Sequence, residues 1–205
     1  NDKNLYSFFQ NVEKEFIDIY ESKDPLIFDI SDDRFIFVTG VSGGGKSTYA
    51  RDNFSSSEYE LIETDKLFND SIEVSEFQHI LRKRIYEAFP DEHYEGSHNL
   101  WINIRHFNEV LQIIMDNRHL TDKTIVLDSG QIRHLNNFNL LIGKVIIVRT
   151  SVVEAIKRAC KRFSDRYPNA TEEEIFAHKT RKYTEYELYK KFNTLIIRLF
   201  VKYKL

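Results

Sequence analysis

The sequence predicts an α/β fold with three layers, in which helices cover both faces of a five-stranded parallel sheet. Short apolar runs of strand length alternate along the chain with longer segments whose apolar residues recur at helical spacing. The first alternation is a strand, a glycine-rich turn and a helix, between residues 35 and 52. Because strands that are joined through helices run in the same direction, we expect the sheet to be parallel.

Five apolar runs are the expected strands. The third is a continuous apolar run that ends in Asp128, which is typical of a strand covered on both faces. In chain order the expected strands are 35–39, 59–64, 124–127, 144–148 and 194–199.

Helical periodicity is expected in the intervals between these strands. An amphipathic helix precedes the first strand and ends at Asp24-Pro25. Two further apolar stripes, at 74–88 and 101–115, flank a polar loop at 91–99, and the first of them stops near Pro90.

Two capping boxes begin the last two expected helices. They are Ser151-x-x-Glu154 and Thr171-x-x-Glu174, and the helix that follows the first should end before Pro168. With 205 residues, the chain suits one domain over 1–205. We expect it to carry an N-terminal helical extension at 1–30, a helical substrate-side insertion at 67–123 and a lid-like helix at 151–168.

Composition excludes several classes of protein. The net charge is −3, so no general attraction to nucleic acid or a membrane surface is expected. The single cysteine, Cys160, excludes an internal disulfide framework and suits a reducing compartment. No apolar run is long enough to span a membrane, and the polar start is not a signal peptide. A cytoplasmic protein is expected.

The glycine-rich turn matches the phosphate-binding loop pattern G-x-x-x-x-G-K-[ST] at every fixed position. Such a loop directs backbone N–H groups at a triphosphate, while its lysine reaches the β- and γ-oxygens and its hydroxyl binds Mg²⁺. A merely flexible loop would not require a lysine and a serine at those places. The expected nucleotide-binding residues are Gly40, Ser42, Gly43, Gly44, Gly45, Lys46, Ser47 and Thr48.

Asp65 is the candidate general base. It follows the second expected strand, and ligands of open parallel sheets bind beyond the carboxyl ends of the strands. A carboxylate there can take the proton of a hydroxyl that attacks a γ-phosphate. A turn or capping aspartate is the alternative interpretation, and Glu63 on the same strand is the second candidate base.

Asp128 is the candidate metal-binding carboxylate, with Ser47 as the other protein ligand of Mg²⁺. A turn residue is again the alternative, since Ser129-Gly130 follows. Gln131 and Arg133 lie just beyond and are weaker candidates for substrate contact.

Three arginines, Arg158, Arg162 and Arg166, recur at intervals of four residues and therefore share one helical face. Guanidinium groups stabilise the negative charge that spreads over a transferring phosphoryl group. We expect Arg158 and Arg162 to act with Lys46 in catalysis and Arg166 to bind the nucleotide. A solvated basic face is the alternative.

The remaining polar and aromatic residues give weaker indications. The histidines form no zinc-binding pattern. The basic residues Lys179, Arg181 and Lys182 are expected to form a solvated face. The tyrosines 183, 186 and 189 are expected to pack.

In this order, the glycine loop, Asp65, Asp128 and the arginine helix resemble the P-loop small-molecule kinases, especially the uridine kinase-like branch. The resemblance covers most of residues 30–200. It implies a P-loop NTPase fold with strand order 2-3-1-4-5, ATP·Mg²⁺ as the donor and a hydroxyl or phosphate as the acceptor. The branch usually has Glu-Gly after its third strand, where this chain has Asp128-Ser129-Gly130.

The leading hypothesis is an ATP- and Mg²⁺-dependent kinase of a nucleoside or nucleotide. A toxin-type kinase of a sugar nucleotide is a variant, and an ATPase module acting on a protein or nucleic acid is the alternative from another class. A GTP-dependent switch is disfavoured because the chain has no N-K-x-D segment. No membrane or nucleic-acid partner is expected, and a homodimer stays open.

Overall fold

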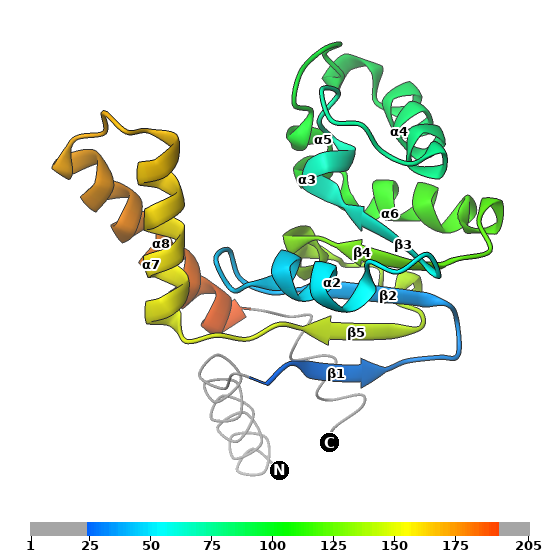
Figure 1. Ribbon diagram of the computed structural model, residues 1–205, viewed down its shortest axis with the longest axis horizontal. Helices are drawn as coiled ribbons and strands as arrows, with labels where there is room; N and C mark the ends of the chain where they lie inside the picture. The colour runs from blue at the N-terminus through cyan, green and yellow to red at the C-terminus, as the bar shows by residue number, and fades with distance from the viewer. Residues whose placement is uncertain (1–23, 193–205) are drawn as a thin grey trace, which may run out of the picture. The chain divides into compact units, whose positions relative to one another are not determined.

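The computed structural model describes residues 24–192, which Figure 1 draws in colour. The chain divides into two compact units that interleave along the sequence. Of the described residues, the first unit contains 24–26, Gly40–Lys46 and 147–192, and the second contains Ile27–Thr39 and Ser47–Ile146. Each is described by itself below.

The second unit is built on a five-stranded sheet with the order β1-β5-β2-β4-β3. β4 pairs in parallel with both β2 and β3, whereas β1 and β5 run in opposite directions (Figure 1). The sheet is therefore mixed and mostly parallel. The strands are β1 (Leu26–Asp29), β2 (Phe35–Thr39), β3 (Tyr59–Glu63), β4 (Thr124–Asp128) and β5 (Lys144–Ile147).

The prediction of a wholly parallel sheet ordered 2-3-1-4-5 is wrong at one edge: β3, β4, β2 and β5 lie in the order predicted for the expected strands 2, 3, 1 and 4, but β1 borders β5 and runs opposite to it. The edge strand is β1, which the sequence analysis did not predict, and the predicted strand at 194–199 lies outside the described residues. β1 has four residues, of which only Phe28 is buried, and its short apolar run directly follows Asp24-Pro25, where the preceding helix was expected to end. A backbone hydrogen bond fixes the residue that follows β1: Ile30 N–H donates to the carbonyl of Gly143 at 2.7 Å.

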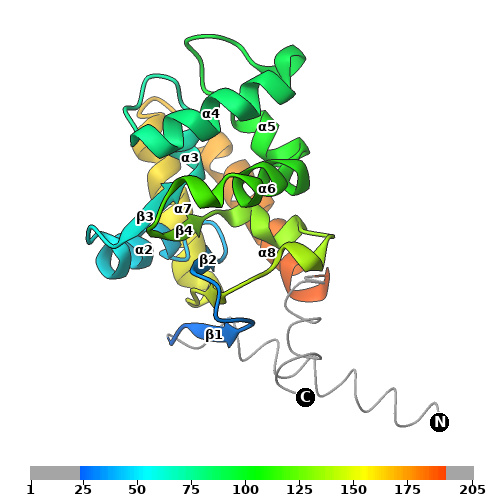
Figure 2. The ribbon, with the colours of Figure 1, turned by 90° about the vertical axis from the view of Figure 1, so that its right-hand side faces the viewer.

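Helices of the second unit flank this sheet. Figure 2 shows α2 and α6 on opposite sides of the strands β2 and β4. The helices are α2 (Lys46–Phe54, with Lys46 counted in the first unit), α3 (Thr64–Leu67), α4 (Glu76–Ala88), α5 (Leu100–Arg105) and α6 (Phe107–Asp116). Short 3₁₀ turns are η1 (Pro90–Glu92), η2 (Arg118–Leu120), η3 (Gly130–His134) and η4 (Phe138–Leu140).

The helical insertion follows the predicted stripes with one difference. α4 begins at the cap Ser75, whose hydroxyl accepts from Gln78 N–H at 3.3 Å, and it ends before Pro90 as expected. The stripe at 101–115 is two helices, because the chain leaves helical geometry at His106 (φ −124°, ψ 34°). On α6 the buried residues are Phe107, Val110, Leu111, Ile114 and Met115.

The described part of the first unit consists mainly of the glycine loop and two helices, α7 (Val152–Arg166) and α8 (Glu172–Phe192). Both predicted capping boxes are confirmed at the backbone. Glu154 N–H donates to the hydroxyl of Ser151, and Glu174 N–H donates to the hydroxyl of Thr171, each at 3.2 Å. α7 ends before Pro168 as expected. α7 and α8 are joined by the rings of Phe163 and His178, which stack at 4.3 Å. The predicted N-terminal helix falls on residues that are not described.

Candidate functional site

The glycine loop of the first unit approaches the backbone of α7 directly. Gly43 and Gly45 have φ of +81° and +90°, a conformation that side chains other than glycine rarely adopt. A Cβ atom at Gly43 would lie 2.4 Å from the carbonyl oxygen of Ala155. Gly44 N–H closes the turn by donating to the carbonyl of Val41 at 2.9 Å. Glycine is therefore required at position 43 by both conformation and space.

Two arginines of α7 extend to this loop. Arg162 donates from Nη2 to the hydroxyl of Ser42 at 3.2 Å. Nη1 of Arg158 lies 3.5 Å from where a Cβ atom of Gly45 would stand, and its Nε donates to Glu154 at 2.9 Å. The structure thus brings the predicted Arg158 and Arg162 beside the predicted loop residues.

Arg166, the third predicted arginine, lines a pocket of about 220 Å³ together with Ser42 of the glycine loop. The pocket combines cations with aromatic rings, which suits an anionic or planar group. Its other lining residues are Ala159, Arg162, Phe163, Tyr167, His178 and Lys182.

α8 contributes two residues to the loop region, Lys182 and Tyr186, which were not predicted to lie at the site. Tyr186 is 1% exposed and donates its hydroxyl to the carbonyl of Ser42. Lys182 lines the same pocket and pairs with Glu185 at 2.9 Å, so the expectation of a solvated face is wrong for this lysine. Lys182 and Tyr186 are four residues apart, and this spacing is the one sequence feature that could have indicated a shared face.

His178 also lines this pocket, and its pKa lies below the usual value. Burial lowers its pKa, and the nearby cations Arg181 and Lys182 lower it further. The positive charge of the pocket therefore comes from its lysine and arginines.

In the second unit, the carboxyl ends of three strands are level with one another. Asp128 at the end of β4 pairs in register with Glu63 of β3 and with Val38 of β2. Asp128 is 4% exposed, and its carbonyl accepts from the hydroxyl of Thr64 at 3.3 Å. Asp128 is therefore at the strand end that the sequence predicts.

Glu63 is held by two cations. Arg51 donates from Nε to its Oε1 at 2.9 Å and from Nη2 to the same oxygen, while Lys66 Nζ lies 2.5 Å from Oε2. Burial tends to raise the pKa of Glu63, but the hydrogen bonds from Arg51 and Lys66 outweigh it and hold the pKa below its usual value. Arg51 correspondingly has a raised pKa, through the hydrogen bond to Glu63. Glu63 is therefore an ion-pair residue and a poor proton acceptor.

Asp65 does not stand at a strand end. β3 stops at Glu63, and Asp65 is the second residue of the short helix α3, where its side chain is exposed. Thr64, predicted as the last residue of the strand, begins that helix and is buried. The carboxylate of Asp65 remains accessible to a substrate.

The residues that could hold Mg²⁺ within the second unit are Ser47, in the first turn of α2, and Asp128. A hydroxyl and a carboxylate fit this metal, which takes few protein ligands and fills its other positions with phosphate and water oxygens. In the part of the chain that the structure describes, no group of three or more His, Cys, Asp or Glu residues could hold a metal by itself. Thr48, the next predicted loop residue, is exposed.

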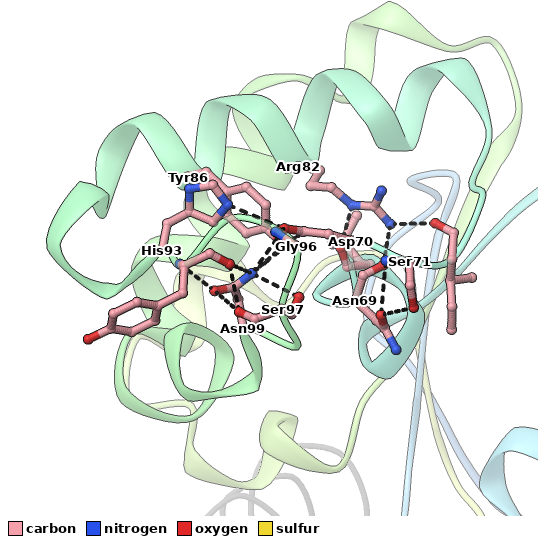
Figure 3. Close-up of polar contacts among 12 residues, drawn as sticks. Asn69, Asp70, Ser71, Arg82, Tyr86, His93, Gly96, Ser97 and Asn99 are labelled. Atoms are coloured by element: carbon pink, nitrogen blue, oxygen red, sulfur yellow. Dashed lines mark hydrogen bonds and ion pairs between the residues drawn. The ribbon is translucent and has the colours of Figure 1, made fainter.

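A polar network in the helical insertion was not predicted (Figure 3). Asp70 accepts from the hydroxyl of Tyr86 at 2.7 Å and from Gly96 N–H at 3.1 Å, and His93 lies 3.5 Å from its Oδ2. The rings of Tyr86 and His93 stack at 3.9 Å. These contacts hold the loop at 93–99, which the sequence indicated only as polar, onto α4.

No protein-family model matches the chain, and no curated protein matches it either. Among solved structures, the crystal structure of TT1252 from Thermus thermophilus matches over 75% of this chain and 83% of that chain. The sequence identity is 16% and the TM-score is 0.34, so no argument rests on this likeness. Among the described residues, no helix has the length and apolar character needed to cross a membrane.

Proposed function

We propose that this chain is an ATP- and Mg²⁺-dependent phosphotransferase that moves the γ-phosphate of ATP to a small-molecule acceptor, of the nucleoside or nucleotide class. The proposal includes a P-loop kinase fold and rests first on the motif at Gly40–Ser47. We infer that Lys46 bridges the β- and γ-phosphates at this loop.

The observation that carries the proposal furthest is the approach of two arginines to the glycine loop. Arg162 bonds Ser42, and Arg158 lies beside Gly45. Both arginines are exposed, as on a solvated basic face, but each also reaches a residue of the glycine loop. Their place at the loop supports a role at the phosphates, where planar N–H groups match phosphoryl oxygens.

The metal would be held by Ser47 and Asp128, and when bound it supplies positive charge to the β- and γ-oxygens. The exposed Asp65 is the proposed base. The acceptor hydroxyl oxygen forms a bond to the γ-phosphorus, its proton passes to the carboxylate of Asp65, and the bond to the β–γ bridging oxygen breaks to leave ADP.

The experiment is incubation of the protein with ATP, Mg²⁺ and a pool of nucleosides, nucleotides and sugar nucleotides, followed by ³¹P NMR and mass spectrometry. A new phosphomonoester or phosphoanhydride supports the kinase, and a sugar-nucleotide product selects the toxin-type variant. Release of inorganic phosphate alone supports the ATPase alternative. Lys46→Ala should abolish the activity, whereas Lys179→Ala, which removes an exposed lysine of α8, should not.

A further inference from the structure

Arg51 and Glu63 connect two segments of the second unit that carry proposed functional residues. Arg51 is on α2, one helical turn after Ser47, and Glu63 ends β3 in register with Asp128. The guanidinium group donates two hydrogen bonds to one oxygen of Glu63. The contact thus joins the helix that bears Ser47 to the strand end beside Asp128.

The exposure of the two side chains separates a positioning contact from an ordinary surface ion pair. The side chain of Glu63 is 10% exposed, whereas that of Arg51 is 53% exposed. Both carboxylate oxygens are engaged, one by Arg51 and the other by Lys66. An exposed ion pair contributes little, but a buried carboxylate with fixed partners holds one geometry.

We propose that Arg51 and Glu63 form a clamp that positions the hydroxyl of Ser47 relative to the carboxylate of Asp128 for binding Mg²⁺. This inference rests on the proposed function. Mg²⁺ demands near-octahedral geometry with short metal–oxygen distances of about 2.0–2.1 Å, so a small shift of one ligand weakens the site. Arg51 acts through these two residues and is a positioning residue.

Lys66 provides a matched control. Lys66→Ala removes one positive charge from the surroundings of Glu63, as Arg51→Ala does. Lys66 lies on α3, however, so its ion pair with Glu63 does not connect β3 to α2. If the clamp is mechanical, Arg51→Ala and Lys66→Ala should differ. If Glu63 needs only neutralising charge, they should behave alike.

The test measures binding of a fluorescent ATP analogue while Mg²⁺, and separately Mn²⁺, is titrated. Arg51→Ala should weaken the apparent affinity for the cation by about 10–100-fold, the range found for residues that orient metal ligands. Lys66→Ala should change it by less than about threefold. In excess EDTA both variants should bind the analogue as the wild type does, because the loop is intact.

Equal effects of the two alanine variants, or wild-type cation dependence in Arg51→Ala, would overturn the clamp. Melting curves identify an unfolded variant, and in that case Arg51→Lys decides: we expect a loss of about tenfold, since lysine cannot reproduce the planar donor pair. Wild-type affinity in that variant would refute the clamp as well. A wild-type chain that binds the analogue without transferring phosphate refutes the phosphotransferase alone, and one that never responds to the cation refutes both.

Discussion

Arg162 Nη2 and Ser42 Oγ lie 3.2 Å apart, although 120 positions separate the two residues in the chain. The hydrogen bond places a guanidinium group of α7 at the glycine loop. The same helix carries Lys161, which is exposed and neighbours Arg162 in sequence. The pair Arg162 and Lys161 therefore offers a test of whether charge at the loop matters.

We expect Arg162→Ala to lower kcat by about 10³–10⁵-fold, as for arginines that stabilise a transferring phosphoryl group. Arg162→Lys should restore part of the rate, because a point charge lacks the planar pair of donors. Lys161→Ala should keep the wild-type rate. Steady-state kinetics decide between an arginine that stabilises the phosphoryl group and one on a solvated basic face. Wild-type kcat in Arg162→Ala would leave the arginine with a structural role only.

Gly43→Ala should reduce ATP affinity and stability more than Gly96→Ala does. Both glycines have positive φ, so alanine costs about 1–2 kcal/mol of backbone strain at either position. A Cβ atom at Gly43 would also meet the carbonyl of Ala155 at 2.4 Å, whereas Gly96 faces open space. Isothermal titration with ATP and melting curves measure the difference, and equal losses would contradict the close approach of loop and helix.

Asp65→Asn and Glu63→Gln should separate catalysis from folding. Asp65 is exposed, so Asp65→Asn should preserve the melting temperature and ATP binding while abolishing phosphate transfer. Glu63→Gln leaves Arg51 and Lys66 without their shared anion, which should cost about 1–3 kcal/mol of the free energy of unfolding. Normal turnover in Asp65→Asn would remove it as the base.

Asp70→Asn should destabilise the protein at neutral pH and lose its effect in acid. Burial tends to raise the pKa of Asp70, but hydrogen bonds from Tyr86, His93 and Gly96 hold it below its usual value. The ionised folded form is therefore favoured above the unfolded carboxyl pKa of about 3.9, and this contribution disappears as the pH falls through the lower folded value. Melting temperatures of the wild type and variant should differ at pH 7 and converge only once the pH is below the pKa of the folded carboxyl, which is itself below the unfolded value of about 3.9.

The control for this experiment is Asp91→Asn, at an exposed carboxylate in η1. It should leave the melting temperature nearly unchanged at every pH. A gap between wild type and Asp70→Asn that persists below the folded pKa would show that shape, and not charge, holds the loop at 93–99.

Much of the local structure could be predicted from residue pattern. Apolar runs predicted β2 at its observed bounds, and β3, β4 and β5 to within one residue. The capping boxes at Ser151 and Thr171 marked where α7 and α8 begin. These features depend on residues within a few positions of one another, and such short-range preferences appear directly in sequence.

The edge of the sheet and the partners of the polar side chains depend on long-range contacts. β1 is a strand although only one of its residues is buried, and backbone bonding at Gly143, more than 100 residues later, holds its end. The same holds for Arg51 with Glu63 and for Tyr186 with Ser42, whose pairing no periodicity indicates. Side chains far apart in the chain meet only once the backbone is packed, so hydrogen bonds and ion pairs of this kind follow from the fold.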